Sequence, residues 1–139
     1  MIVDAEVPVA RPRQDVFDLM ADARNETVWN SQVTSSELVS GEPIGQGSRF
    51  VTVNRGQSYD ATITTYDRPD EIAFDVVGKT LRIVGRFRFT GAGDSTVVRA
   101  SFDMQPRGIM KVLLPLMSPM VRRDFPKQLD SFKAFCESR

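Results

Sequence analysis

The last part of the chain repeats apolar residues at three- and four-residue spacing, which predicts one long helix between Gln105 and Arg139. Pro115, Pro119 and Pro126 lie inside this pattern. A proline in a helix interior removes a backbone donor and costs about 3 kcal/mol, so we expect the helix to bend. The stretch Ile109–Val121 is almost entirely apolar, which is more than one packed stripe requires. We therefore expect a bent helix with two apolar sides, one on a sheet and one facing a cavity or a lid.

Alternation of apolar and polar residues predicts strands over the rest of the chain, interrupted once by helical spacing. A first strand over Ile2–Pro8 precedes two short helices, one opened by Pro12 and ending near Ala21, the other spanning Asp22–Asn30. Turn-forming residues then separate six strands, expected at Val33–Val39, Ser48–Asn54, Tyr59–Tyr66, Ile72–Val77, Leu81–Phe89 and Val98–Met104. This order predicts one α+β domain over residues 1–139, in which the terminal helix covers the open face of a curved antiparallel sheet.

Charge gives little reason to expect a nucleic-acid partner. The 18 basic and 18 acidic residues of the 139-residue chain cancel, so no global field favours a polyanion. The balance is uneven, because from Arg107 onward seven Lys/Arg stand against three Asp/Glu, leaving eleven against fifteen before it. A solvated basic helix face explains this excess, and a docking surface for an acidic partner is the alternative.

Missing residue types and segments narrow the possible chemistry. Cys136 is the single cysteine, and no signal peptide or 20-residue apolar span is recognisable, so we expect a cytoplasmic protein without a transmembrane segment. The chain contains no histidine, which removes Ser-His and Cys-His nucleophile pairs and ordinary zinc sites. We expect no metal and no cofactor. Any catalysis would depend on carboxylates, Tyr, Arg, Lys or water.

Several segments together resemble the START-like (SRPBCC) superfamily, in particular its polyketide cyclase/dehydrase branch. They are Ala5–Met20, Asp22–Asn30, Gly45–Phe50 and Ile63–Phe74, and the resemblance extends over nearly the whole chain. It implies a helix-grip fold, with a seven-stranded curved antiparallel sheet around a long C-terminal helix and a cavity between them. It also implies binding of apolar small molecules such as lipids, polyketides, hormones or quinones, with catalysis in only some members. No catalytic position can be carried over onto this sequence.

Large apolar residues on the sheet and on the helix are the candidates for lining the cavity. We expect a ligand to contact Trp29, Phe50, Ile63, Phe74, Ile83, Phe87, Phe102, Met104, Met110, Leu113, Leu114, Met117 and Met120. Methionine adapts to irregular shapes, so the four methionines form either a pliable pocket wall or ordinary core filling. Trp29 borders the cavity mouth or anchors the core.

The polar candidates are ambiguous because one β-bulge would reverse the parity of a strand. Arg82, Arg86 and Arg88 share one strand face, with Arg99 on the next strand, and either bind an anionic ligand or form a solvated outer face. The outer face is favoured because burying unpaired cations is costly. Possible bases or carbonyl-orienting groups are Asp60, Asp75, Asp103, Tyr59 and Tyr66, for each of which a structural role is favoured. Cys136 is expected to pack rather than to react.

Three functions of different classes follow from these observations. The first is binding of an apolar small molecule, such as a lipid, polyketide or quinone, for transport, sensing or sequestration. The second is a cyclase or dehydratase that works without metal or nucleotide cofactor, by a carboxylate or Tyr in a desolvated cavity. The third is a module that docks a protein or a membrane through its basic helix. The missing catalytic set favours the first, and the oligomeric state, monomer or dimer, stays open.

Overall fold

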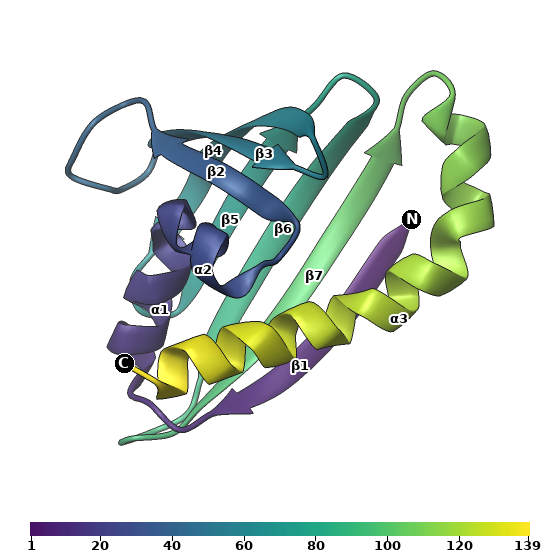
Figure 1. Ribbon diagram of the computed structural model, residues 1–139. Helices are drawn as coiled ribbons and strands as arrows, with labels where there is room; N and C mark the ends of the chain where they lie inside the picture. The colour runs from purple at the N-terminus through teal and green to yellow at the C-terminus, as the bar shows by residue number, and fades with distance from the viewer.

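The computed structural model describes all residues from Met1 to Arg139 and contains a seven-stranded sheet and three helices (Figure 1). The strands are β1 (Ile2–Val9), β2 (Val33–Leu38), β3 (Arg49–Asn54), β4 (Gln57–Asp67), β5 (Glu71–Val77), β6 (Leu81–Thr90) and β7 (Thr96–Pro106). The helices are α1 (Arg13–Ala21), α2 (Glu26–Trp29) and α3 (Met110–Glu137). A 3-10 turn at Ala23–Asn25 leads into α2.

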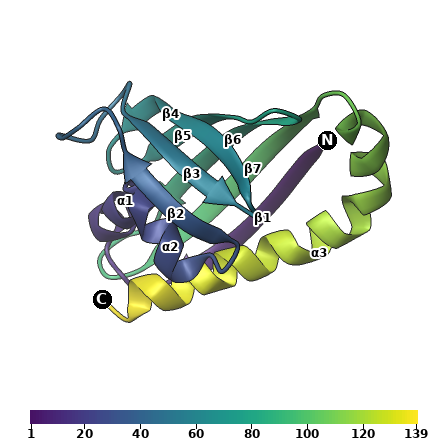
Figure 2. The same cartoon turned by 45° about the horizontal axis from the view of Figure 1, so that its top comes forward.

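Every neighbouring pair of strands is antiparallel, in the order β1-β7-β6-β5-β4-β3-β2. The sheet curves strongly, and α3 passes across its open side while α1 and α2 lie near one end (Figures 1 and 2). This confirms the predicted helix-grip architecture, including the two short helices after the first strand. The covered face of the sheet holds the apolar core.

The arginines of β6 lie on the outer face of the sheet, as the cost of burying them predicts. Arg82 forms an ion pair with Asp75 on the neighbouring strand, with Nε and Oδ1 2.9 Å apart. Arg86 and Arg88 both pair with Glu71, at 2.6 and 2.8 Å. Their apolar neighbours in sequence, Phe87 and Phe89, are buried on the opposite face.

Helix α3 begins at Met110, later than the Gln105 expected from the sequence. The reason is that β7 continues as far as Pro106, which pairs with Leu81 of β6. Gly108, with a φ of +57°, then turns the chain into the helix. None of the helices combines the length and the hydropathy needed to cross a bilayer.

The two halves of α3 differ in burial. The second half places five residues in the core, namely Phe125, Leu129, Phe132, Phe135 and Cys136. In the first half Leu114 is the only buried residue. Figure 1 shows the first, greener part of α3 bent away from the direction of the yellow part, and Pro115, Pro119 and Pro126 all lie within the helix.

Candidate functional site

A cavity of about 540 Å³ lies between the covered face of the sheet and α3. Residues from the sheet, α2 and α3 contribute to its wall, and 18 of the 29 lining residues are hydrophobic. A space of this size and character is typical of small-molecule sites. The few polar lining residues would therefore determine the orientation of a bound molecule.

Ten of the thirteen residues predicted from the sequence line this cavity. They are Trp29, Phe74, Ile83, Phe87, Phe102, Met104, Met110, Leu114, Met117 and Met120. Phe50 and Ile63 do not line it, and both pack in the core cluster with no exposed surface. Leu113 does not line it either and is 39% exposed, since successive helix residues point about 100° apart and its neighbour Leu114 faces inward.

Cross-strand register brings the lining residues of the central strands together. Gly85 of β6 pairs with Phe74 of β5 on one side and with Phe102 of β7 on the other. A Cβ added to Gly85 would lie 3.0 Å from the Phe102 ring. The ring therefore uses the space that a side chain at position 85 would occupy.

An aromatic series connects this part of the sheet to α3. The ring centroids of Phe74 and Phe87 are 6.4 Å apart, and those of Phe87 and Phe102 are 5.5 Å apart. Phe102 in turn lies 4.8 Å from Phe125 of α3. The first two pairs are edge-to-face and the third is tilted. Edge-to-face pairs add to the stabilisation from burial alone. The Phe102–Phe125 pair packs α3 against β7 in the cavity wall.

Glu26 is the most unusual polar residue of the cavity. It begins α2 and lies one helical turn before Trp29, and both residues line the space. Its carboxyl group has no hydrogen-bond or ion-pair partner elsewhere in the chain. Burial without a partner raises the pKa of Glu26 from 4.5 to about 7. A carboxyl group with this pKa exchanges a proton readily near neutral pH.

Tyr59 of β4 and Asp124 of α3 also line the cavity. Burial raises the pKa of the Tyr59 hydroxyl, so this group is a hydrogen-bond donor at neutral pH. Asp124 forms an ion pair with Arg123, with Oδ1 and Nε 3.2 Å apart. Among the cavity carboxyl groups, only Glu26 is free of such a pair.

The acidic residues proposed from the sequence as possible bases lie outside the cavity. Asp75 is held by Arg82, as described above. Asp60 lies 3.7 Å from Arg49, and Asp103 lies 3.9 Å from the N-terminal amine. Alternation along the strands directs these three side chains away from the covered face.

Tyr66 and Cys136, the two remaining candidates, both have packing roles. Tyr66 packs edge-on against Phe17 of α1, with ring centroids 5.1 Å apart. Cys136 is fully buried, and burial raises the pKa of its thiol to about 12. A thiol with this pKa is not a nucleophile at neutral pH.

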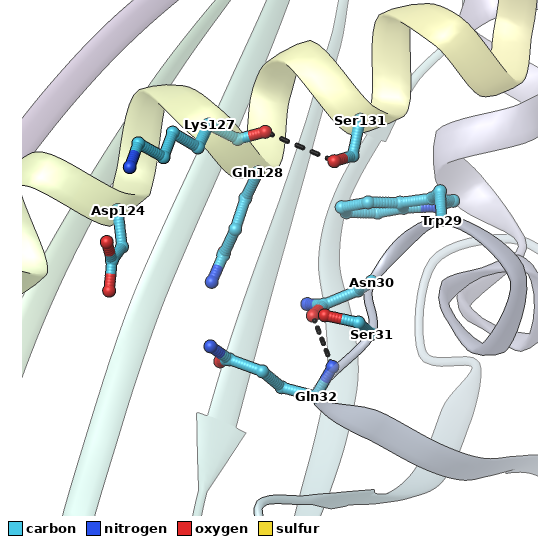
Figure 3. A pocket seen from close by; sticks show the side chains of 8 residues that line it. All are labelled: Trp29, Asn30, Ser31, Gln32, Asp124, Lys127, Gln128 and Ser131. Atoms are coloured by element: carbon cyan, nitrogen blue, oxygen red, sulfur yellow. Dashed lines mark hydrogen bonds between the residues drawn. The ribbon is translucent and has the colours of Figure 1, made fainter.

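A smaller polar hollow of about 240 Å³ adjoins the cavity (Figure 3). Five residues border both spaces, namely Trp29, Asn30, Gln32, Asp124 and Gln128. In Figure 3 the Gln128 side chain points from α3 toward Gln32. The Asn30 side-chain oxygen accepts a hydrogen bond from the backbone N–H of Gln32 at 3.1 Å. The hollow is thus a polar vestibule between α3 and the segment that joins α2 to β2.

Neither Glu26 nor the vestibule was predicted from the sequence. Glu26 and Trp29 are three residues apart on one short helix, and this spacing could have predicted that both side chains lie on the same helix face. The vestibule had no such signal, because its residues come from segments about a hundred positions apart.

Comparison with known proteins gives one family. The sequence model of the family described as polyketide cyclase / dehydrase and lipid transport matches residues 1–137. No curated protein is significantly similar in sequence.

Solved structures share the fold at low sequence identity. A START superfamily protein from Mycobacterium smegmatis superposes with a TM-score of 0.73 at 18% identity, over 99% of this chain and 95% of that chain. The Zhui aromatase/cyclase from Streptomyces sp. R1128 superposes with a TM-score of 0.80 at 17% identity, over 100% of this chain and 94% of that chain. A hypothetical protein from Helicobacter pylori superposes with a TM-score of 0.82 at 13% identity, over 98% of this chain and 88% of that chain. At these identities the likeness shows the fold alone.

Proposed function

The chain belongs to the polyketide cyclase / dehydrase and lipid transport family, and we propose that it binds an apolar small molecule, such as a lipid, polyketide or quinone, under α3. One observation carries this proposal: the cavity of about 540 Å³ has a mostly hydrophobic wall. Drug-sized ligands occupy pockets of roughly 300–1,000 Å³ with this kind of lining. Binding would then serve transport, sensing or sequestration.

The distribution of side chains supports a ligand with an apolar body and one polar end. Met104, Met110, Met117 and Met120 line the cavity, and flexible thioether side chains adapt to ligands of different outline. Polar groups of the cavity lie in two places. One is near α2 and the vestibule, and the other is at the β3–β4 turn, where Asn54, Arg55 and Gln57 line the space. The apolar part would lie among the methionines, and the polar end would point toward Glu26.

Native purification followed by solvent extraction and mass spectrometry tests the proposal, together with displacement of a dansyl-labelled fatty acid. A matched pair of variants locates the site. Leu114→Trp fills space inside the cavity and should weaken probe binding, whereas Leu113→Trp lies on the exposed side and should leave it unchanged. Absence of both an extracted ligand and probe binding, or equal effects of the two variants, would argue against a cavity ligand.

A cyclase or dehydratase activity is the second candidate, and Glu26 is the observation that favours it. A carboxylate with a pKa of about 7 can remove the proton from a carbon between two ketone groups. The carbanion then forms a carbon–carbon bond to another carbonyl of the same molecule, whose oxygen takes a proton, and loss of water completes the dehydration. Tyr59 would donate a hydrogen bond to a carbonyl oxygen.

Glu26→Gln separates this candidate from simple binding. The catalytic proposal expects turnover of a poly-ketone substrate analogue to be lost while the dansyl probe still binds. Its rate should rise as pH increases through about 7, because the ionised carboxylate is the base. Turnover by Glu26→Gln equal to that of the natural sequence would eliminate this mechanism.

A further inference from the structure

The start of α3, with the residue before it, carries a second apolar face, most of which lies on the side away from the cavity. Ile109, Val112, Leu113 and Leu116 are 63, 64, 39 and 74% exposed. Their spacing places these four residues on one helix face, which we call the outer face. Met110, Leu114 and Met117, at intervening positions, line the cavity. Ile109, the residue before α3, contributes both to the outer face and to the cavity wall, whereas Val112, Leu113 and Leu116 do not line the cavity. One stretch of helix therefore presents apolar side chains both to the cavity and to solvent.

This clustering is unusual within the molecule. Seven large hydrophobic residues are exposed in the whole chain, and four of them form the outer face. Val28 on α2 and Val39 after β2 are exposed elsewhere on the fold. Single exposed residues need no explanation, whereas a contiguous apolar patch indicates an interaction surface.

The charges beside the outer face are mainly positive. Arg107, Lys111, Arg122 and Arg123 lie within the sequence from 107 to 123, which contains no Asp or Glu. Arg107 and Lys111 have no ion-pair partner, and Arg122 donates a hydrogen bond to the Ile2 carbonyl oxygen at 3.2 Å. Arg123 forms an ion pair with Asp124, so three of the four cations are without a carboxylate partner. An apolar helix face bordered by cations is typical of helices that lie in the interface of an anionic membrane.

We propose that the outer face docks onto the surface of an anionic membrane. Charge disfavours a second copy of the chain as the occupant, because pairing two outer faces would bring two sets of three unpaired cations together, Arg107, Lys111 and Arg122 of each copy. Shape favours a flat surface, since Figures 1 and 2 show the first part of α3 at an edge of the molecule with no other element outside it. The helix would lie on the membrane rather than cross it.

This inference does not depend on the proposed ligand. Docking would, however, bring the cavity within one helix diameter of the lipid, roughly 10 Å, because the same helix stretch forms both surfaces. A ligand passing between membrane and cavity would have to cross only this bent, weakly packed part of α3.

Sedimentation with ligand-free vesicles tests the docking, using phosphatidylcholine alone and phosphatidylcholine mixed with phosphatidylglycerol. We expect the protein to bind the mixed vesicles, to bind the neutral ones weakly, and to lose binding at high salt. Val112→Ser and Leu116→Ser should each lower partitioning roughly tenfold. Val28→Ser is the matched control, since Val28 and Val112 are both 64% exposed, and it should have no effect.

Three results would overturn the inference. The first is equal sedimentation with and without the anionic lipid, and the second is an equal loss from Val28→Ser and Val112→Ser. The third is a concentration-dependent dimer in light scattering that Val112→Ser abolishes, because this would make the outer face a self-association surface. Circular dichroism of each variant confirms folding, and retained binding of the dansyl fatty acid by Val112→Ser would show that the cavity is independent of the docking surface.

Discussion

The indole ring of Trp29 meets the phenyl ring of Phe132 edge-on, with the ring centroids 5.3 Å apart. This contact joins α2 to the second half of α3, where Phe132 is fully buried. Trp29 also lines the cavity and the vestibule. The pair thus lies where the structural part of the helix meets the candidate site, and the two parts should respond differently to mutation.

Phe132→Ala should lower the free energy of unfolding by about 3–5 kcal/mol, because it removes a fully buried aromatic ring and leaves a cavity. Urea unfolding followed by circular dichroism measures this change. Ser131→Ala is the control, since Ser131 is exposed and donates only to the Lys127 carbonyl oxygen one turn earlier. A loss below about 1 kcal/mol for Phe132→Ala would show that this half of α3 is not the structural clamp.

Met117→Ala should change ligand affinity more than stability. The Met117 side chain lines the cavity and is only partly buried, so its truncation widens the cavity without opening a void in the packed core. Displacement of the dansyl fatty acid measures the affinity of the variant, and urea unfolding measures its free energy of unfolding. If Met117→Ala and Phe132→Ala lower stability equally, the whole helix is core and the proposed division fails.

Glu26→Gln should change how stability depends on pH. Because burial raises the pKa of Glu26 to about 7, the native state binds more protons than the unfolded state between pH 4.5 and 7. Stability of the natural sequence should therefore fall as pH rises through this range. At about 1.4 kcal/mol per pKa unit, the fall amounts to at most roughly 3 kcal/mol.

Urea unfolding at pH 5 and pH 8 measures this effect. Glu26→Gln should be stabilised relative to the natural sequence at pH 8 by more than at pH 5, because Gln carries no charge to desolvate. Glu37→Gln, at an exposed position of β2, provides the control for losing one acidic residue. If the stability of Glu26→Gln depends on pH as strongly as that of the natural sequence, other groups cause the pH dependence.

The architecture could be predicted from the sequence because alternation and helical spacing are local properties. The switch of period at Val33 marks the sheet, and the apolar excess of Ile109–Val121 marks a helix with two apolar sides. The exact start of α3 was missed because β7 is prolonged by its pairing with β6, which is not a local property.

The positions of the site residues could not be predicted from the sequence, because they depend on the three-dimensional packing. Ala61 and Ile63 lie two residues apart on the same face of β4, yet Ala61 lines the cavity and Ile63 is fully buried in the core. Periodicity gives the face of a strand and not the position along it where packing ends and a cavity begins. For the same reason Leu113 and Leu114 could not be separated before the rotation of α3 about its axis was known.

Gly78 gives a test of the cavity that leaves its wall chemically unchanged. A Cβ added at Gly78 would lie 2.6 Å from Cε1 of Tyr59 and 3.2 Å from the Leu81 carbonyl oxygen. Because the Gly78 backbone does not have a positive φ, an alanine backbone is not strained there, and the effect comes from the contacts of the new methyl group, of which the one with the Tyr59 ring is the shortest. Gly78→Ala must therefore displace the Tyr59 ring, which lines the cavity.

We expect Gly78→Ala to weaken binding of the dansyl fatty acid and to destabilise the fold by about 1–3 kcal/mol, as overpacking does. The same substitution in a Tyr59→Leu background should have a much smaller effect on both, since the shorter side chain leaves room for the new methyl group. Equal losses in the two backgrounds would place the clash at the Leu81 carbonyl oxygen instead. In that case the position of the Tyr59 ring would not control access to the cavity.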